Sequence, residues 1–331
     1  MLTRRPLAAT LCAIALCCAT LLASAPPANA YGSQGHRTIA RLAQERLNAT
    51  ARARIQNILG NTDLVALAMW PDELKQAKKG KGPLKNDPEA KAFNQKFPGN
   101  GGWHFVNLPL DTTAYQLNGP FSKPDDVVHI IEDCVRVLEG TSTRFTKRQA
   151  LRFLVHLAGD IHQPLHVGCG YYRFDDDSNA LIVTNPAEAV GLTHDTGGNV
   201  LFFSENDDGE PNQLHSFWDT ALVERLTGSG GVTALANFLA QRVDNPDPSW
   251  STPGTHRRWA RHWATDSVTQ SREVYRGLTF GQAFFEDDER LQEIETTLPP
   301  NYAANQRERA AAQLAKAGFR LKELLNRIQW Q

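Results

Sequence analysis

Apolar residues recur every three to four positions along most of the chain, which is the period of an amphipathic helix. The clearest case is residues 147–162, where Leu151, Leu154 and their apolar neighbours share one face. By the same criterion we expect helices at Thr38–Leu47, Thr50–Leu59, Asp63–Lys79, Asp125–Leu138, Leu214–Arg225, Val232–Arg242, Thr255–Tyr275 and Tyr302–Ile328. The pattern therefore predicts a mainly α fold.

Strand-like segments are few and short. Ala180–Thr184 and Val200–Phe203 are rich in residues that favour strands, and Gly197-Gly198-Asn199 precedes the second segment. We therefore expect a small β-hairpin in this part of the chain. Residues 80–102 are rich in Gly, Lys, Asn and Pro, so a surface loop is expected there.

Between this loop and the helix at 147–162, the pattern is less regular. We expect Trp103–Pro109 to be extended or 3₁₀, and we expect Ser122 or Asp125 to cap the helix that ends at Leu138. No internal repeat, low-complexity tract or Pro/Gly/Ser-rich linker divides the chain. Residues 31–331 are therefore expected to form a single multi-helix domain.

The first 30 residues differ from the rest. Arg4 and Arg5 precede an apolar run from Leu7 to Ala23, and the small residues of Ala28-Asn29-Ala30 follow. This order is typical of a secretory signal peptide cleaved after Ala30. A membrane anchor is the alternative, but the run is short for a bilayer span and lacks a stop-transfer flank. We expect a secreted or periplasmic chain with no membrane anchor.

Removing residues 1–30 changes the charge and the cysteine count. That segment holds two Arg and no acidic residue, so the formal net charge goes from −1 to −3. This balance excludes a general basic coat for nucleic acid, and any such binding needs a local site. Of the five cysteines, Cys134 and Cys169 remain. In an exported protein they suggest one disulfide bond, provided that the fold brings them together.

The helix at 147–162 carries polar residues within its apolar pattern. His156 and Asp160 are four positions apart, so they lie about one turn apart on the same face. Pro164 ends the helix, and His166 follows in the turn. A divalent metal ion would satisfy these polar groups. This spacing alone is a weak signal, because most single helical histidines are core or surface residues.

The rest of the chain supplies more residues of the same kind. His215 and Asp219 repeat the four-residue spacing on another predicted helix. Five of the ten histidines and three aspartates stand in such contexts: His36, Asp72, His104, His156, Asp160, His166, His215 and Asp219. A set of His and Asp without thiolate suits zinc better than manganese or iron. Eight ligands are too many for one tetrahedral ion and suit two or three ions.

The ordered motifs resemble a known family. They are Tyr31-Gly-Ser-Gln-Gly-His36, Trp70-Pro-Asp72, His104-Phe-Val-Asn107, Val155-His-Leu-Ala-Gly-Asp-Ile-His-Gln-Pro-Leu-His166, Gly197-Gly-Asn199 and His215-Ser-Phe-Trp-Asp219. This set is similar to the secreted trinuclear-zinc nuclease and 3′-nucleotidase family, called the nuclease S-one or nuclease P-one type. The resemblance runs from Tyr31 through the final helix. It implies the mainly α fold of the zinc phospholipase C and single-strand nuclease type.

The resemblance also implies three zinc ions, with Asp160 as the carboxylate that bridges two of them. The implied ligands are Asp72, His104, His156 and Asp160 for the first ion, His166, His215 and Asp219 for the second, and His36, Asp160 and the main-chain nitrogen and oxygen of Tyr31 for the third. The family usually begins its mature chain with Trp, where this sequence has Tyr31. Because main-chain atoms bind the metal, we expect no loss of zinc from this difference.

The implied substrates are single-stranded DNA, RNA and 3′-nucleotides, and the implied products are 5′-phosphorylated. Phe105 is the candidate for stacking on a base, and Lys75 is a candidate for neutralising phosphate. Asn199 is a candidate for reading a base edge or orienting the phosphate, and with Asp160 it completes the candidate catalytic residues. Some relatives have an acid at the position of Asn107, so we assign it no catalytic role. We expect a monomer.

Two other functions fit the same metal ligands. A phospholipase C-like phosphodiesterase would use the same ions but would need an acid-lined, apolar pocket for a choline-type head group. A non-catalytic zinc-binding protein would need no open position for water, and the sequence does not distinguish it from an enzyme.

Overall fold

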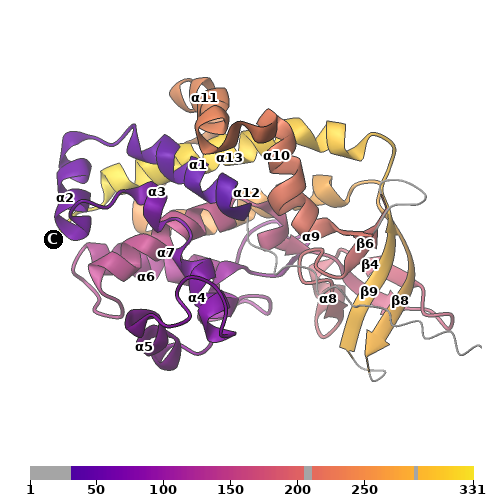
Figure 1. The fold of residues 1–331 in the computed structure, drawn as a ribbon. Coiled ribbons are helices and arrows are strands. Elements are labelled where there is room, and N and C mark those ends of the chain that lie inside the picture. Colours follow the sequence, from indigo (N-terminus) through magenta and orange to yellow (C-terminus); the bar gives the residue numbers. More distant parts are fainter. Residues whose placement is uncertain (1–30, 205–210, 287–289) are drawn as a thin grey trace, which may run out of the picture.

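The computed structural model describes residues 31–204, 211–286 and 290–331. The expected signal peptide, residues 1–30, lies outside these ranges. Helices dominate the described chain, and the small sheets gather at one end of the molecule (Figure 1). The mainly α fold predicted from the apolar pattern is confirmed.

Three helices form the centre of the molecule. They are α1 (Gly32–Gln44), α7 (Lys147–Asp160) and α13 (Tyr302–Arg327), which pack against one another. In Figure 1, α13 runs along α1 for much of its length. Helix α6 (Val127–Leu138) packs on α7 from another side. Because α7 is surrounded, almost all of its residues are buried, including its polar ones. Anything that α7 presents is therefore held in a rigid, dry setting.

The sequence at the start of α7 and α6 explains where each helix begins. Thr146 accepts a hydrogen bond from the backbone of Gln149, whose side chain bonds back to Thr146, which is a capping box. Helix α6 is capped by Asp126, which accepts from the backbone N–H groups of Val128 and His129. The prediction of Ser122 or Asp125 as this cap was therefore wrong by at least one residue.

The other helices are shorter or lie outside this centre. They are α2 (Ala49–Leu59), α3 (Leu64–Leu67), α4 (Trp70–Lys78), α5 (Pro88–Lys96), α8 (Pro186–Ala189), α9 (Leu214–Ser216), α10 (Leu222–Thr227), α11 (Gly231–Asp244), α12 (Trp259–Tyr275), the 3₁₀ turns η1 (Asn100–His104), η2 (Pro164–His166), η4 (Gly228–Gly230), η5 (Pro248–Trp250) and η6 (His256–Arg258), and the π-helical turn η3 (Phe217–Ala221).

Within the described ranges, the strands form three small sheets. They are β1 (Leu108–Pro109), β2 (Gly168–Cys169), β3 (Tyr171–Phe174), β4 (Ala180–Val183), β5 (Thr193–His194), β6 (Leu201–Phe203), β7 (Asn212–Gln213), β8 (Thr279–Glu286) and β9 (Arg290–Thr297). Their orders are β1-β2, β4-β3-β5 and β7-β6-β9-β8. Both predicted strands exist as β4 and β6, but they lie in different sheets, so a hairpin formed by this pair was wrong. The consecutive strands that pair antiparallel are β3 with β4, β6 with β7 and β8 with β9.

Two further expectations were wrong in part. The predicted loop 80–102 contains helix α5, where Asp87 is the cap and Phe93 is buried. The predicted helix 63–79 is interrupted at Ala68 and Met69, between α3 and α4. By contrast, residues 103–109 contain the end of a 3₁₀ turn and strand β1, as the prediction allowed.

Cys134 and Cys169 are both buried and both remain free thiols. The predicted disulfide bond is therefore wrong. Burial raises the pKa of each thiol well above its usual value, so neither is a reactive thiolate.

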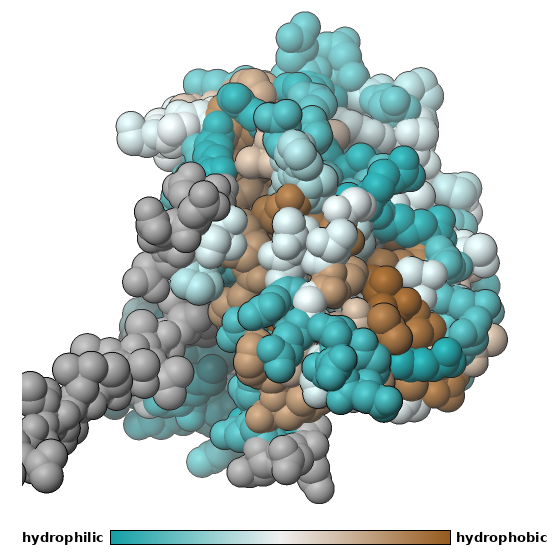
Figure 2. Space-filling view, turned by 90° about the vertical axis from the view of Figure 1, so that its right-hand side faces the viewer, coloured by the Kyte–Doolittle hydropathy of each residue, from teal (hydrophilic) through white to brown (hydrophobic). Residues whose placement is uncertain are grey.

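The surface of the sheet end is mixed. Apolar patches alternate with hydrophilic side chains on this face (Figure 2). Among the described residues, the large apolar side chains that are exposed are Leu181, Val190, Phe238 and Phe284. None of the described helices combines the length and the apolar character needed to cross a bilayer.

Candidate metal centre

Eight of the sequence-predicted ligand side chains come together in the interior of the molecule. Their sources are α1 (His36), α4 (Asp72), η1 (His104), α7 (His156 and Asp160), η2 (His166), α9 (His215) and η3 (Asp219). All eight are buried. They form three groups in which one ligand atom of each residue lies within 4.8 Å of the others: His36, Asp72 and His156; His104, His156 and Asp160; and, as the second group of ligands, His166, His215 and Asp219. The described chain therefore gathers the predicted His and Asp side chains around one centre.

Asp160, at the end of α7, lies in the middle of this centre. Its Oδ2 is 2.9 Å from Nδ1 of His104 and 3.4 Å from Nε2 of His156. Its Oδ1 is 3.3 Å from Nε2 of His36. The two carboxylate oxygens therefore face different imidazoles, which is the geometry that a bridging carboxylate needs.

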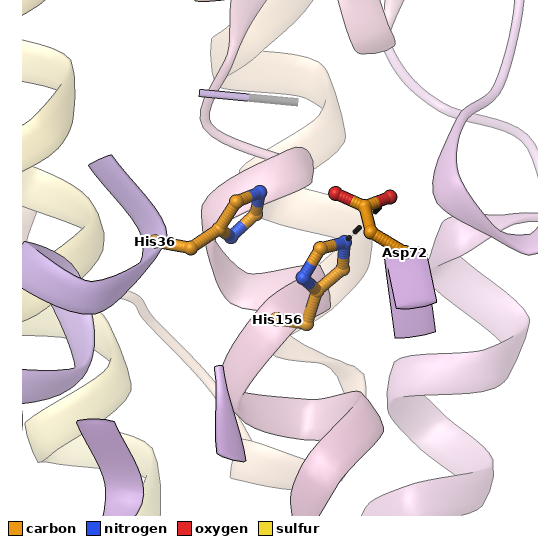
Figure 3. A group of neighbouring side chains, drawn as sticks. All are labelled: His36, Asp72 and His156. Carbon is orange, nitrogen blue, oxygen red and sulfur yellow. Dashed lines mark ion pairs between the residues drawn. The ribbon is translucent and has the colours of Figure 1, made fainter. Parts of the chain in front are cut away.

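His36, Asp72 and His156 project toward one another from three different helices (Figure 3). The rings of His36 and His156 stack, with centroids 3.9 Å apart and an interplanar angle of 9°. Nε2 of His156 is 3.7 Å from Oδ1 of Asp72. His36 reaches this position because α7 has Gly159 on the facing side, where an added Cβ would lie 2.7 Å from Nδ1 of His36.

In the second group, His166, His215 and Asp219, two imidazole nitrogens face each other in a way that calls for a cation between them. Nδ1 of His166 is 2.8 Å from the carbonyl oxygen of His104, and Nδ1 of His215 is 2.6 Å from that of Gly197. A carbonyl oxygen only accepts, so both Nδ1 atoms carry a proton and both Nε2 atoms present lone pairs. These Nε2 atoms face each other at 3.1 Å, and Oδ2 of Asp219 is 3.2 Å from that of His215. A metal ion or an added proton would relieve this contact.

Several ligand atoms of the centre have no hydrogen-bond partner among the described residues. They are both ring nitrogens of His36, Nε2 of His104, both oxygens of Asp72, Oδ1 of Asp160 and Oδ2 of Asp219, although Lys75 forms an ion pair with Asp72. Buried polar groups are almost always satisfied. Divalent cations would satisfy this combination of imidazole nitrogens and carboxylate oxygens, so the residues fit a metal centre.

The first described residue is also part of the surroundings. The backbone nitrogen of Tyr31 lies 3.1 Å from Oδ1 of Asp219, 188 residues away in the sequence. The Tyr31 ring is fully buried, and its hydroxyl donates to the carbonyl oxygen of His162. The backbone of Tyr31 adopts the left-handed conformation, with φ 42°. The structure thus places the start of the expected mature chain beside Asp219, which the resemblance assigned to the second ion, whereas it assigned Tyr31 to the third.

Comparison with known proteins agrees with this geometry. A family model described as S1/P1 nuclease matches residues 31–329. The chain belongs to the S1/P1 nuclease family. Endonuclease 2 of Arabidopsis thaliana is 25% identical over 323 residues, which is 93% of each chain. Nuclease P1 of Penicillium citrinum is 24% identical over 316 residues, covering 90% of this chain and 97% of its own. Nuclease S1 of Aspergillus oryzae is 24% identical over 329 residues, covering 95% and 96%.

The resemblance drawn from the motifs is therefore confirmed. The family and these relatives are nucleases, so the membership supports a nuclease, which is a hydrolase, and nucleic acid as the class of substrate. In this member of the S1/P1 nuclease family, several groups of buried His and Asp side chains are suited to holding metal ions.

The electrostatics of the carboxylates favour cations. Burial alone would raise the pKa of Asp72, but Lys75 and then the nearby histidines lower it below its usual value. For Asp160, His156, His104 and His36 outweigh burial in the same way and lower the pKa well below its usual value. Both carboxylates are therefore ionised at neutral pH.

The histidines differ from one another. Burial lowers the pKa of His156 to about 3 and that of His166 to about 4, despite the opposing effect of Asp160. These two rings are neutral at physiological pH, as metal ligands must be. Burial would lower the pKa of His215, but Asp219 and the hydrogen bond to the Gly197 carbonyl together raise it above its usual value.

Lys75 lies at the edge of the centre. Its Nζ is 2.6 Å from Oδ1 of Asp72, and its side chain is 24% exposed. Burial would lower the pKa of Lys75, but Asp72 and the more distant carboxylates Asp160 and Asp219 raise it. The ammonium group is therefore charged and paired with Asp72 at the edge of the centre.

Phe105 lines a pocket beside the centre. The pocket has a volume of about 240 Å³ and also presents Asn107, Lys123, Tyr171 and His194. We call it the Phe105 pocket. Phe105 directly follows His104 in the chain, although none of the predicted ligands lines the pocket. Asn199 is placed differently: its side-chain amide donates to the carbonyl oxygen of Thr196, within its own turn. Its predicted contact with substrate stays a prediction.

Sequence reasoning missed Asp195. This buried carboxylate accepts hydrogen bonds from the hydroxyls of Tyr172 and Tyr275 and from the backbone N–H groups of Gly170 and Gly198. Burial raises the pKa of Asp195 to about 6, against the lowering effect of these bonds. Asp195 holds the turn whose Gly197 carbonyl orients His215. The order Asp-Thr-Gly-Gly in the sequence could have indicated this role, because an aspartate before two glycines is typical of a residue that stabilises a turn.

Proposed function

We propose that this protein is a zinc-dependent nuclease that hydrolyses phosphodiester bonds in single-stranded DNA and RNA, giving 5′-phosphorylated products, with 3′-nucleotidase activity. We further propose that it binds three zinc ions through the ligands named above, is secreted or periplasmic, and acts as a monomer. One observation carries the proposal. Eight His and Asp side chains converge in a buried centre where several ligand atoms lack hydrogen-bond partners, and family membership supports nuclease chemistry.

Zinc supplies Lewis acidity when bound and lowers the pKa of a bound water to roughly 7. The chain prepares the site for this chemistry. Asp160 faces His36 with one oxygen and His104 with the other, so this single carboxylate would be able to hold two ions. Lys75, beside Asp72, adds positive charge at the solvent edge, where it would neutralise a phosphate oxygen.

The Phe105 pocket supports a single-strand substrate. Its aromatic side chains, Phe105 and Tyr171, offer stacking surfaces for a base that has left a duplex. The phenolic oxygen of Tyr171 donates to the backbone of Asn107, which fixes the ring. A base held there would place its attached phosphate near His104 because Phe105 is the next residue. A double-stranded substrate cannot offer an unpaired base in this way.

The pocket also weighs against a lipid substrate. A choline-type head group calls for carboxylates facing an apolar pocket. The only carboxylate among its described lining residues is Asp126. Asp126 is buried, caps α6 and accepts from the hydroxyl of Tyr115. Lys123 adds positive charge to the same pocket, which opposes a cationic head group.

The test is a set of parallel digestions by the purified mature chain, residues 31–331. The substrates are single-stranded DNA, RNA, 3′-AMP and phosphatidylcholine, each with and without a chelator. We expect chelator-sensitive cleavage of the first three and none of the lipid. Lipid turnover without nucleic-acid cleavage would support the phospholipase alternative. Stoichiometric zinc with no turnover of any substrate would support a non-catalytic zinc-binding protein.

A further inference from the structure

A second pocket adjoins the Phe105 pocket. It has a volume of about 360 Å³ and is lined by Leu108, by parts of the segment 111–122 and by residues 185–187 at the start of α8. We call it the Asn185 pocket. Neither the sequence motifs nor the metal ligands involve it, so it has no role in the function proposed so far.

The two pockets share one wall, formed by Pro120, Phe121 and Ser122. The Phe121 ring packs edge-on against Tyr171, with centroids 5.4 Å apart. Tyr171 in turn is fixed by its hydrogen bond to Asn107. Phe121 is therefore held in place by Tyr171, and together with Pro120 and Ser122 it separates the two neighbouring pockets.

The lining of the Asn185 pocket suits an uncharged ring with donors and acceptors. Gln116 and Asn185 supply amides, and Phe121 supplies an aromatic side chain. Oδ1 of Asn185 accepts from the backbone of Ala187, so the amide NH₂ group remains able to donate. The one charged lining residue described, Asp111, lies 3.8 Å from the guanidinium of Arg272, which offsets its charge.

A cation lies at the same boundary. Lys123 follows the shared wall directly, lines the Phe105 pocket and is exposed. Burial lowers the pKa of His194, another residue of the Phe105 pocket, and the Lys123 ammonium lowers it further. A phosphate that joins two nucleotides, one in each pocket, would pass this lysine.

We propose that the Asn185 pocket binds a second nucleobase of the same single strand, next to the base held beside Phe105. The inference rests on the proposed nuclease function. On this proposal, a dinucleotide places its scissile phosphate at the metal centre and one base in the Phe105 pocket, and it leaves the Asn185 pocket empty. A third nucleotide adds a stacking contact with Phe121 and polar contacts with Asn185, and it lowers KM without changing the chemical step.

The experiment compares thymidylate dinucleotide, trinucleotide and tetranucleotide as substrates of the zinc-loaded chain. We expect kcat/KM to rise about fivefold or more from two to three nucleotides, through KM, because each stacked base adds binding energy of that order. Equal kcat/KM for the dinucleotide and the trinucleotide would overturn the inference. Cleavage of no oligonucleotide at all would instead refute the proposed function on which it rests.

Two variants locate the effect. Asn185→Ser keeps a helix-capping oxygen but removes the amide, and Ala187→Leu narrows the pocket. Each should abolish most of the gain from the third nucleotide and leave dinucleotide turnover within about twofold of the parent. The matched control is Asn245→Ser, an exposed asparagine after α11, which should change neither. Equal losses for the dinucleotide and the trinucleotide in both pocket variants would overturn the inference.

Discussion

At the level of single residues, the proton positions of three histidines determine what the centre binds. His156, His166 and His215 each donate Nδ1–H to a main-chain carbonyl oxygen and turn Nε2 toward the other ligands. Such partners fix the tautomer and the orientation of a metal-binding ring. The sequence identified these histidines by spacing and motif. It did not identify their acceptors, because each acceptor belongs to a distant segment of the chain.

Asp160 is the residue whose loss should have the largest effect. In Asp160→Asn, an amide that bridges metal ions poorly replaces a buried carboxylate that faces His36 and His104. We expect nuclease activity to fall by more than about a hundredfold, the upper effect of losing a residue that only orients a ligand. Metal analysis should show fewer zinc ions per chain. Full zinc occupancy in the variant would refute the bridging role, and Asp244→Asn, at an exposed ion pair, should retain both zinc and activity.

The raised pKa of His215 predicts a pH dependence of metal binding. In the metal-free chain, Asp219 favours the protonated ring, and that proton competes for the Nε2 that would bind zinc. Zinc affinity of the second group should therefore fall as the pH drops below this raised pKa, by up to about tenfold per pH unit. Zinc-competition titrations between pH 5 and 8 measure this slope. Affinity that stays constant over that range would contradict it.

The same proton affects the stability of the metal-free chain with the opposite sign. Because the folded-state pKa of His215 is raised, its contribution is complete below the unfolded value and is lost as the pH rises through the folded value. His156 and His166 have lowered pKa values of about 3 and about 4, so they oppose folding at low pH. Acidification should therefore destabilise the chain through these two rings.

At the level of elements, apolar periodicity predicted the helices that form the centre of the fold and failed for irregular segments. Helix α5 carries a recognisable Asp87-Pro88 start, but its short apolar face was hidden among Gly and Lys residues. The β8-β9 hairpin has register shifts between Phe280 and Ala283 and between Phe284 and Phe285. These irregularities break the two-residue alternation by which a strand is identified in a sequence.

Close packing of α1 on α7 depends on a glycine. Gly159→Ala would place a methyl group 2.7 Å from Nδ1 of His36 and 3.3 Å from Cδ1 of Ile39. We expect the variant to displace His36 and to lower the free energy of unfolding by about 1–3 kcal/mol, as overpacking does. Zinc content per folded chain should fall, measured by metal analysis after gel filtration.

Gly318→Ala separates the two effects. Its added methyl would lie 2.9 Å from Cβ of Leu42. This contact is between α13 and α1, whereas Gly159 lies where α7 contacts α1 beside the ligand His36. It should lower stability to a similar extent while zinc content stays at the level of the parent chain. If both variants lose zinc equally, general destabilisation explains the loss and the positioning role of Gly159 is wrong.

At the level of the whole molecule, the topology brings together the ligand side chains that the spacing of motifs in the sequence only suggests. The motifs supplied the eight His and Asp side chains, and the family resemblance assigned them to three ions, but the spacing of the residues does not show how the chain brings them together. The structure places Asp72 with His36 and His156, and it places Tyr31 beside Asp219. These contacts join segments that lie far apart in the sequence, by 188 residues for Tyr31 and Asp219, and no local pattern encodes them. The wall shared by the two pockets also depends on a contact between distant segments, that of Phe121 with Tyr171.

The position of Tyr31 leads to a prediction about processing. Its nitrogen lies 3.1 Å from Asp219 in a fully buried setting, and its ring is held by the bond to His162. A free α-amino group at this position adds a metal-binding nitrogen, whereas a peptide nitrogen does not. A chain that begins at Tyr31 should therefore bind one more zinc ion than a chain extended by a single Ala30, which retains the ligands of the other two groups. Native mass spectrometry counts the ions, and thermal melts in zinc should show the extended chain to be less stable.

Chains extended by one and by five residues should behave alike, because the loss of the free amine is the cause. Equal zinc counts in the exact and extended chains would show that the N-terminus is not a ligand.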